Sequence, residues 1–197
     1  MELTFTIDAN AFALVISGSP PRPLGTAFAF LKPTWFITAK HVVVCEGLRR
    51  PEIFISTHGH SHVPVEVIFV HPEIDIAVLQ TDSPVCLHPL YPAHHSIVGS
   101  QGLVYAGFAP SRSTAASPTV LTSAIPEYEV ETRERGMGDE ETIVFSATES
   151  EGGNSGGPVL GDNGAVVAVI IQNFERDGRL TARATSILPL NDRLSIA

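Results

Sequence analysis

Ser155 lies at the centre of the stretch best suited to nucleophilic chemistry, Glu151-Gly-Gly-Asn-Ser-Gly-Gly-Pro-Val159. The glycines on both sides of the serine accept positive φ and let other chain segments approach the backbone closely. The apolar run that starts at Pro158 predicts a strand, so we expect Ser155 on a tight loop that leads into it. A glycine-rich strand connection without a function is the alternative, because glycine and serine also fill ordinary turns.

The order of residues along the chain decides which serine chemistry this loop can support. Gly153-Asn-Ser155-Gly-Gly157 fits the G-x-S-x-G pattern of the α/β-hydrolase elbow, which requires a histidine after the serine. All eight histidines of this chain precede Ser155. That leaves the order His, Asp, Ser, which a second type of serine hydrolase uses.

Two other side chains are candidate partners for Ser155. His41 ends the apolar run that begins at Trp35, where a strand would give way to a short turn. Asp75 comes at the start of an otherwise apolar strand, where a carboxylate would be partly desolvated and would need a partner. Each of them alone fits an ordinary structural role: a core histidine, or a residue of a strand-end turn.

Together, three segments resemble the catalytic motifs of the trypsin-like serine proteases, and most of all those of the bacterial, disulfide-free HtrA/Deg type. They are Thr38-Ala-Lys-His41, Asp75-Ile-Ala-Val-Leu79 and Gly153-Asn-Ser-Gly-Gly-Pro158, and the resemblance spans roughly residues 24 to 190. It implies a cofactor-free serine endopeptidase with a His41, Asp75, Ser155 triad and no metal. It also implies an oxyanion hole made by the backbone N–H groups of Gly153 and Ser155.

The resemblance implies a set of substrate-binding residues as well. Glu149, six residues before the serine, would form the floor of the primary pocket and pair with a Lys or Arg of the substrate. One inserted residue would instead turn Glu149 out to solvent. The wall of the pocket would come from Ile170, Ile171, Gln172 and Asn173, whose backbone would pair with a substrate strand.

Short apolar runs punctuated by glycine and proline predict many short strands and an all-β fold. We expect two antiparallel six-stranded β-barrels of the chymotrypsin-like kind, in residues 1–90 with His41 and Asp75 and in residues 91–197 with Ser155. The segment 83–96 would link them, and a short helix would end the chain. The expected strands cover residues 3–7, 12–17, 26–31, 35–38, 53–56, 65–70, 76–80, 103–108, 120–125, 142–146, 159–160, 166–171 and 181–186.

Composition limits the compartment and the partners. The net charge of -9 disfavours binding to nucleic acid or to an anionic membrane, and the chain has no apolar stretch long enough to cross a bilayer. The first sixteen residues contain no basic residue, unlike a secretory signal. With only Cys45 and Cys86 present, we expect free thiols and a cytoplasmic location; a single bridge between them is the alternative.

Three further segments carry expectations of their own. Two segments are predicted to be mobile surface: residues 110–118 and the charged residues 131–141. The charged segment is either a loop that becomes ordered on activation or substrate binding, or simply a solvated surface loop, which is the favoured interpretation. A possible metal site is formed by three histidines at alternate positions, His58, His60 and His62. In an extended segment, alternate side chains share one face and could bind one metal ion. Because no acidic or cysteine ligand accompanies them, an exposed hairpin tip is the favoured interpretation.

A function of another class competes with the peptidase. The fold could serve as a binding or scaffold module whose triad is latent or idle until a partner protein activates it. Retention of all three triad residue types favours the enzyme, whose partners would be protein or peptide substrates.

Overall fold

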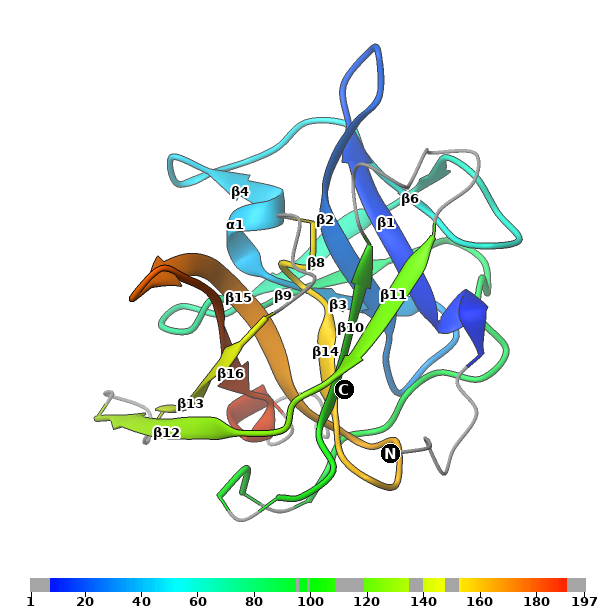
Figure 1. Cartoon of the computed structure of the whole chain (residues 1–197). Coiled ribbons are helices and arrows are strands. Elements are labelled where there is room, and N and C mark those ends of the chain that lie inside the picture. Colours follow the sequence, from blue (N-terminus) through cyan, green and yellow to red (C-terminus); the bar gives the residue numbers. More distant parts are fainter. Residues whose placement is uncertain are drawn as a thin grey trace.

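The computed structural model describes residues 8–94, 96–98, 100–108, 119–134, 140–147 and 153–190. Two antiparallel sheets dominate it, one from each half of the chain (Figure 1). The first sheet has the order β7-β6-β1-β2-β3-β9-β8. Its strands are β1 (Phe12–Ser17), β2 (Arg22–Ala29), β3 (Trp35–Thr38), β6 (Ile53–Ser56), β7 (Val63–Pro64), β8 (Glu66–Val70) and β9 (Ala77–Gln80).

The first sheet curls into a barrel, as its connectivity requires. Its two edge strands, β7 and β8, are consecutive in the chain and only Val65 separates them. The two edges must therefore meet. Val65, the residue between them, extends the pairing of β6 with β7, since its amide donates to the Ile53 carbonyl at 3.2 Å. A closed sheet leaves no long unpaired edge.

The second sheet closes in the same way. Its order is β11-β10-β14-β15-β16-β13-β12, and residues 125–127 alone connect the two edge strands. Its strands are β10 (Val104–Phe108), β11 (Val120–Ala124), β12 (Tyr128–Arg133), β13 (Glu140–Ser146), β14 (Pro158–Leu160), β15 (Val166–Arg176) and β16 (Arg179–Ser186). The all-β double-barrel prediction is confirmed, although each sheet has seven strands in the described residues where six were predicted.

Small elements complete the described part of the chain. A 3-10 turn, η1 (Ala9–Ala11), precedes β1, and the one-turn helix α1 (Lys40–Val43) follows β3 and leads into the hairpin β4 (Val44–Cys45) and β5 (Leu48–Arg49). Residues 188–190 are helical, which fits the predicted C-terminal helix. Residues 191–197, over which that prediction also extends, lie outside the described residues.

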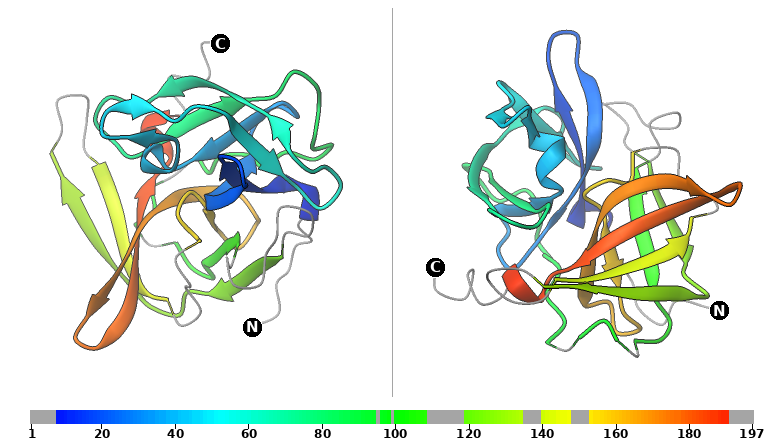
Figure 2. Two further views of the ribbon diagram at one scale, coloured as in Figure 1. Left: turned by 90° about the horizontal axis from the view of Figure 1, so that it is seen from above. Right: turned by 90° about the vertical axis from the view of Figure 1, so that its left-hand side faces the viewer.

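Two apolar clusters form the core. One lies within the second barrel and includes Tyr105, Phe145 and Ile170. The other fills the first barrel and also includes Phe108 and Val169 from the second sheet. The barrels therefore share packed side chains, and in the right-hand view of Figure 2 the blue and cyan half lies directly beside the green and orange half.

The segment between the sheets is attached to both of them. The Leu90 amide donates to the Ala29 carbonyl on β2 at 2.9 Å, and the Ala93 amide donates to the Val166 carbonyl on β15 at 2.8 Å. This connection fits a linker, and the boundary between domains 1–90 and 91–197 stays a prediction.

The charged segment 131–141 was predicted wrongly where the structure describes it. Residues 131–133 end β12 and residues 140–141 begin β13, and Arg133 pairs with Glu140 in the ladder. Most residues of β12 are exposed to solvent, so the strand lacks the apolar alternation by which strands are recognised. The predicted strand at residues 3–7 and the predicted mobile segment 110–118 lie outside the described residues.

Candidate active site

His41 is the second residue of α1, which follows the end of β3 at Thr38 and has Ala39 as its N-cap residue. Ala39 offers no side chain to cap the helix, and Asp75 supplies the missing acceptors from a distant turn. The Asp75 carbonyl accepts from the Lys40 amide at 3.2 Å, and Asp75 Oδ1 accepts from the His41 amide at 2.9 Å. Asp75 thus satisfies N–H groups that every helix start leaves without an intrahelical partner.

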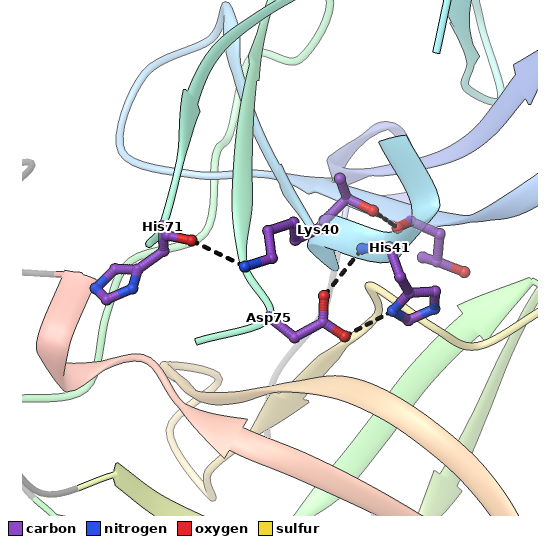
Figure 3. A network of polar contacts seen from close by, with 6 residues as sticks. Lys40, His41, His71 and Asp75 are labelled. Atoms are coloured by element: carbon purple, nitrogen blue, oxygen red, sulfur yellow. Dashed lines mark hydrogen bonds and ion pairs between the residues drawn. The ribbon is translucent and has the colours of Figure 1, made fainter. Parts of the chain in front are cut away.

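The second carboxylate oxygen of Asp75 meets the imidazole. Asp75 Oδ2 lies 2.6 Å from His41 Nδ1 (Figure 3). A carboxylate can only accept, so His41 Nδ1 carries the proton and Nε2 is the unprotonated nitrogen of the neutral ring. The two side chains are 48% and 27% exposed, and pairs this accessible to water add little to stability. The contact therefore sets the tautomer and direction of the ring more than it stabilises the fold.

Ser155 lies on the predicted tight loop, directly before β14. The Gly157 amide donates to the Asn154 carbonyl at 2.8 Å and closes the turn. Gly156 has φ of +86°, and a Cβ there would lie only 2.1 Å from the Thr26 carbonyl oxygen. This position therefore requires glycine for both its conformation and its space.

Thr26 on β2 fastens the serine loop to the first barrel. Its amide donates to the Ser155 carbonyl at 2.8 Å and its hydroxyl donates to the Gly153 carbonyl at 2.7 Å. The same hydroxyl accepts from the Phe108 amide at 3.0 Å, and the Thr26 carbonyl accepts from the Thr38 hydroxyl at 2.7 Å. The sequence pattern assigns no role to Thr26, and a threonine within an apolar run is the only signal that it leaves. Thr38 begins the His41 motif, but its contact with β2 was not predicted.

The serine loop and the histidine helix meet over Gly25. A Cβ on Gly25 would lie 2.7 Å from the Ser155 carbonyl oxygen and 2.8 Å from Cγ2 of Val42, the residue after His41. Among the described residues, no hydrogen bond joins the Ser155 hydroxyl to His41. Such bonds are often long in unliganded enzymes and tighten when substrate binds.

The four predicted wall residues all lie on β15, which leads away from the serine loop. Both backbone groups of Ile170 are engaged with that loop: its carbonyl accepts from the Gly156 amide at 2.7 Å and its amide donates to the Gly157 carbonyl at 2.8 Å. The pairing with β16 then shifts register between Ile170 and Gln172, so Ile171 is a bulge residue. Gln172 is exposed and Asn173 is partly buried. Glu149, the predicted pocket floor, lies outside the described residues.

Both cysteines and the three alternating histidines take no part in the contacts described above. Cys45 is exposed and Cys86 is buried, and both are free, which confirms the free-thiol prediction. Burial raises the pKa of the Cys86 thiol.

The three histidines His58, His60 and His62 lie exposed between β6 and β7. In the described ranges, no group of three or more His, Cys, Asp or Glu side chains could hold a metal ion.

Two antiparallel barrels, with a His–Asp pair on the first and a glycine-flanked serine on the second, define the class of trypsin-like peptidases. The chain matches the family model described as a trypsin-like peptidase domain over residues 25–169, and it belongs to that family. Among curated proteins, none matches the chain significantly. No helix within the described residues is long and apolar enough to cross a membrane.

Solved structures with the same fold include several bacterial proteases. The Rv3671c protease of M. tuberculosis, in its active form, is 21% identical with a TM-score of 0.69, over 95% of this chain and 80% of that one. The MamO protease domain of Magnetospirillum magneticum is 20% identical with a TM-score of 0.70, and the match covers 94% of this chain and 96% of that one. The HtrA-type protease AlgW with a decapeptide is 17% identical with a TM-score of 0.67, and the match covers 95% of this chain and 64% of that one. At these identities the likeness establishes the fold.

Proposed function

We propose that this chain is a serine endopeptidase that acts through His41, Asp75 and Ser155. The observation that carries the proposal is the 2.6 Å contact between His41 Nδ1 and Asp75 Oδ2, because it directs the basic Nε2 away from the carboxylate. The serine loop lies against the same helix, with the Ser155 carbonyl and the Val42 side chain meeting over Gly25. A base, its orienting carboxylate and a nucleophile in one neighbourhood are the requirements of acyl transfer.

In the proposed reaction, Ser155 Oγ attacks the substrate carbonyl carbon while His41 Nε2 takes the hydroxyl proton. The N–H groups of Gly153 and Ser155 would stabilise the negative oxygen of the tetrahedral intermediate. The C–N bond then breaks, and His41 returns the proton to the leaving amine. Water attacks the acyl-enzyme by the same route, which releases the acid and restores the serine.

Substrate selection is the finer part of the proposal. Ile171, Gln172 and Asn173 would pair with an extended substrate, since the backbone of Ile170 already bonds to the serine loop. Glu149 would favour Lys or Arg before the cut bond through charge pairing. We also propose a cytoplasmic location, in keeping with two free thiols.

Labelling with a fluorophosphonate probe tests the function. We expect labelling of the wild type, loss of labelling in Ser155→Ala, and cleavage of a peptide library. Glu149→Ala should lose cleavage after Lys and Arg selectively, whereas Glu66→Ala, an exposed carboxylate on β8, should not. A preference for acidic or apolar residues would overturn the role of Glu149. Absence of labelling, alone and with candidate activators, would instead favour the binding or scaffold module.

A further inference from the structure

The turn that carries Asp75 is folded around the imidazole of His71. His71 Nδ1 accepts from the Glu73 amide at 3.2 Å and from the Ile74 amide at 3.1 Å. The His71 amide donates to the Ile76 carbonyl at 2.9 Å and closes the turn on its other side. His71 is only 2% exposed, so water cannot easily replace these bonds.

The two amide donors determine the state of the ring. Because Nδ1 accepts from both, it carries no proton, and the neutral ring bears its hydrogen on Nε2. An acceptor on Cγ that receives bonds from amides two and three residues later is the pattern that Asp and Asn side chains make in Asx turns. His71 performs that capping role with a nitrogen in place of an oxygen.

Lys40 ties this turn to the helix that carries His41. Its Nζ donates to the His71 carbonyl at 3.1 Å, and its amide donates to the Asp75 carbonyl at 3.2 Å. Figure 3 shows Lys40 between the labelled His71 and Asp75, with His41 on the far side of the carboxylate. Both ends of the turn are therefore bonded to the first residue of α1.

We propose that His71 is a positioning residue for the catalytic histidine. By accepting from two amides just before Asp75, it fixes the path of the backbone that aims the carboxylate at the His41 amide and ring. Loss of the Nδ1 acceptor would leave two N–H groups unpaired, and the turn would relax to satisfy them. The catalytic consequence rests on the proposed peptidase function, whereas the geometric claim does not.

The test compares side chains that differ at the acceptor atom. His71→Asn places Oδ1 on Cγ where Nδ1 now lies, and His71→Leu has similar branching but no acceptor. Glu73→Gln is the matched control, because it changes a side chain in the same turn and keeps the capped amide. Two readouts are measured: kcat/KM on a cleaved peptide, and the downfield proton NMR resonance of the hydrogen between His41 Nδ1 and Asp75 Oδ2.

We expect His71→Leu to lower kcat/KM by about 100-fold, chiefly through kcat, since small misplacements of catalytic groups have effects of this size. The downfield resonance should disappear at a temperature where circular dichroism shows the variant folded. His71→Asn and Glu73→Gln should keep the resonance and stay within about threefold of wild-type kcat/KM.

Two results would overturn the proposal: a folded His71→Leu that keeps the resonance, or a folded His71→Asn that loses it as completely as His71→Leu. If His71→Leu does not fold, loss of the resonance in a folded His71→Asn but not in Glu73→Gln would still overturn the proposal. A wild type without peptidase activity would refute the proposed function alone, because the resonance reports the His41–Asp75 contact independently of turnover.

Discussion

The Thr26 hydroxyl donates a hydrogen bond to the Gly153 carbonyl over 2.7 Å, across a sequence separation of 127 residues. Thr26 belongs to the first barrel and Gly153 to the loop of the proposed nucleophile, so this bond spans the two halves of the candidate site. Thr26 is completely buried, and its amide also holds the Ser155 carbonyl. The position of the serine relative to α1 therefore depends on a residue of β2.

Replacing Thr26 with valine tests this dependence. Thr26→Val keeps the shape but leaves the Gly153 carbonyl and the Phe108 amide without their partner, which should lower the free energy of unfolding by about 1–3 kcal/mol. Because the loop would be held less firmly, we expect kcat to fall more than KM changes. Thr26→Ser retains the hydroxyl and should approach the wild type in urea unfolding and in steady-state kinetics. Equal behaviour of the two variants would contradict the role of the hydroxyl.

Replacing the carboxylate of Asp75 with an amide tests the role of the His–Asp contact. Asp75→Asn can present an N–H to Nδ1 and so favour the wrong tautomer of His41. We expect kcat to fall by about 10⁴-fold while the fold persists. Asp82→Asn, at an exposed position beyond β9, serves as the matched control. Full activity of Asp75→Asn in a peptide-cleavage assay would show that Asp75 does not orient the base.

Adding one methyl group at position 156 should disrupt the serine loop. In Gly156→Ala, the new Cβ would lie 2.1 Å from the Thr26 carbonyl oxygen and 2.3 Å from the Thr38 hydroxyl, at a φ that disfavours alanine. We expect a lower melting temperature and loss of fluorophosphonate labelling. Gly178→Ala is the comparison, since it has a φ of +72° but no atom within 4 Å of its Cβ. If both variants lose labelling equally, close packing at Gly156 is not the cause.

The two thiols should react differently. Cys45 is exposed, whereas Cys86 is buried with a raised pKa, so alkylation of the native protein should modify Cys45 first. Mass spectrometry after native and denaturing alkylation should count one and then two adducts. Rapid modification of Cys86 in native Cys45→Ser would refute the assignment.

The same raised pKa predicts a dependence of stability on pH. The folded state keeps the Cys86 proton to higher pH than the unfolded state, so this group's contribution is complete below the thiol's ordinary pKa. It is lost as pH rises toward the folded-state pKa. Urea unfolding at increasing alkaline pH should show a smaller loss of stability in Cys86→Ala than in the wild type.

Several features of this protein were predictable from the amino-acid sequence because they are local. Apolar runs bounded by turn residues located β1, β3 and β6 with the same bounds that the structure has. The glycine pattern predicted the tight loop of Ser155, and the order of His41, Asp75 and Ser155 separated one class of serine hydrolase from another. The strands and the serine loop depend only on neighbours in the chain, where backbone preferences and side-chain periodicity act. The class of hydrolase depends only on the order of three residues along the chain, which the sequence states directly.

Tertiary structure decided what depends on distant partners. The mostly exposed strand β12 has no apolar alternation, and its pairing with β13 supplies the hydrogen bonds that make it a strand. The Thr26 hydroxyl contacts the Gly153 carbonyl, and Lys40 Nζ contacts the His71 carbonyl. Both contacts join polar groups that are far apart in the chain and that only folding brings together. A buried donor or acceptor must find a partner wherever one lies, and only the folded chain determines which residue that is.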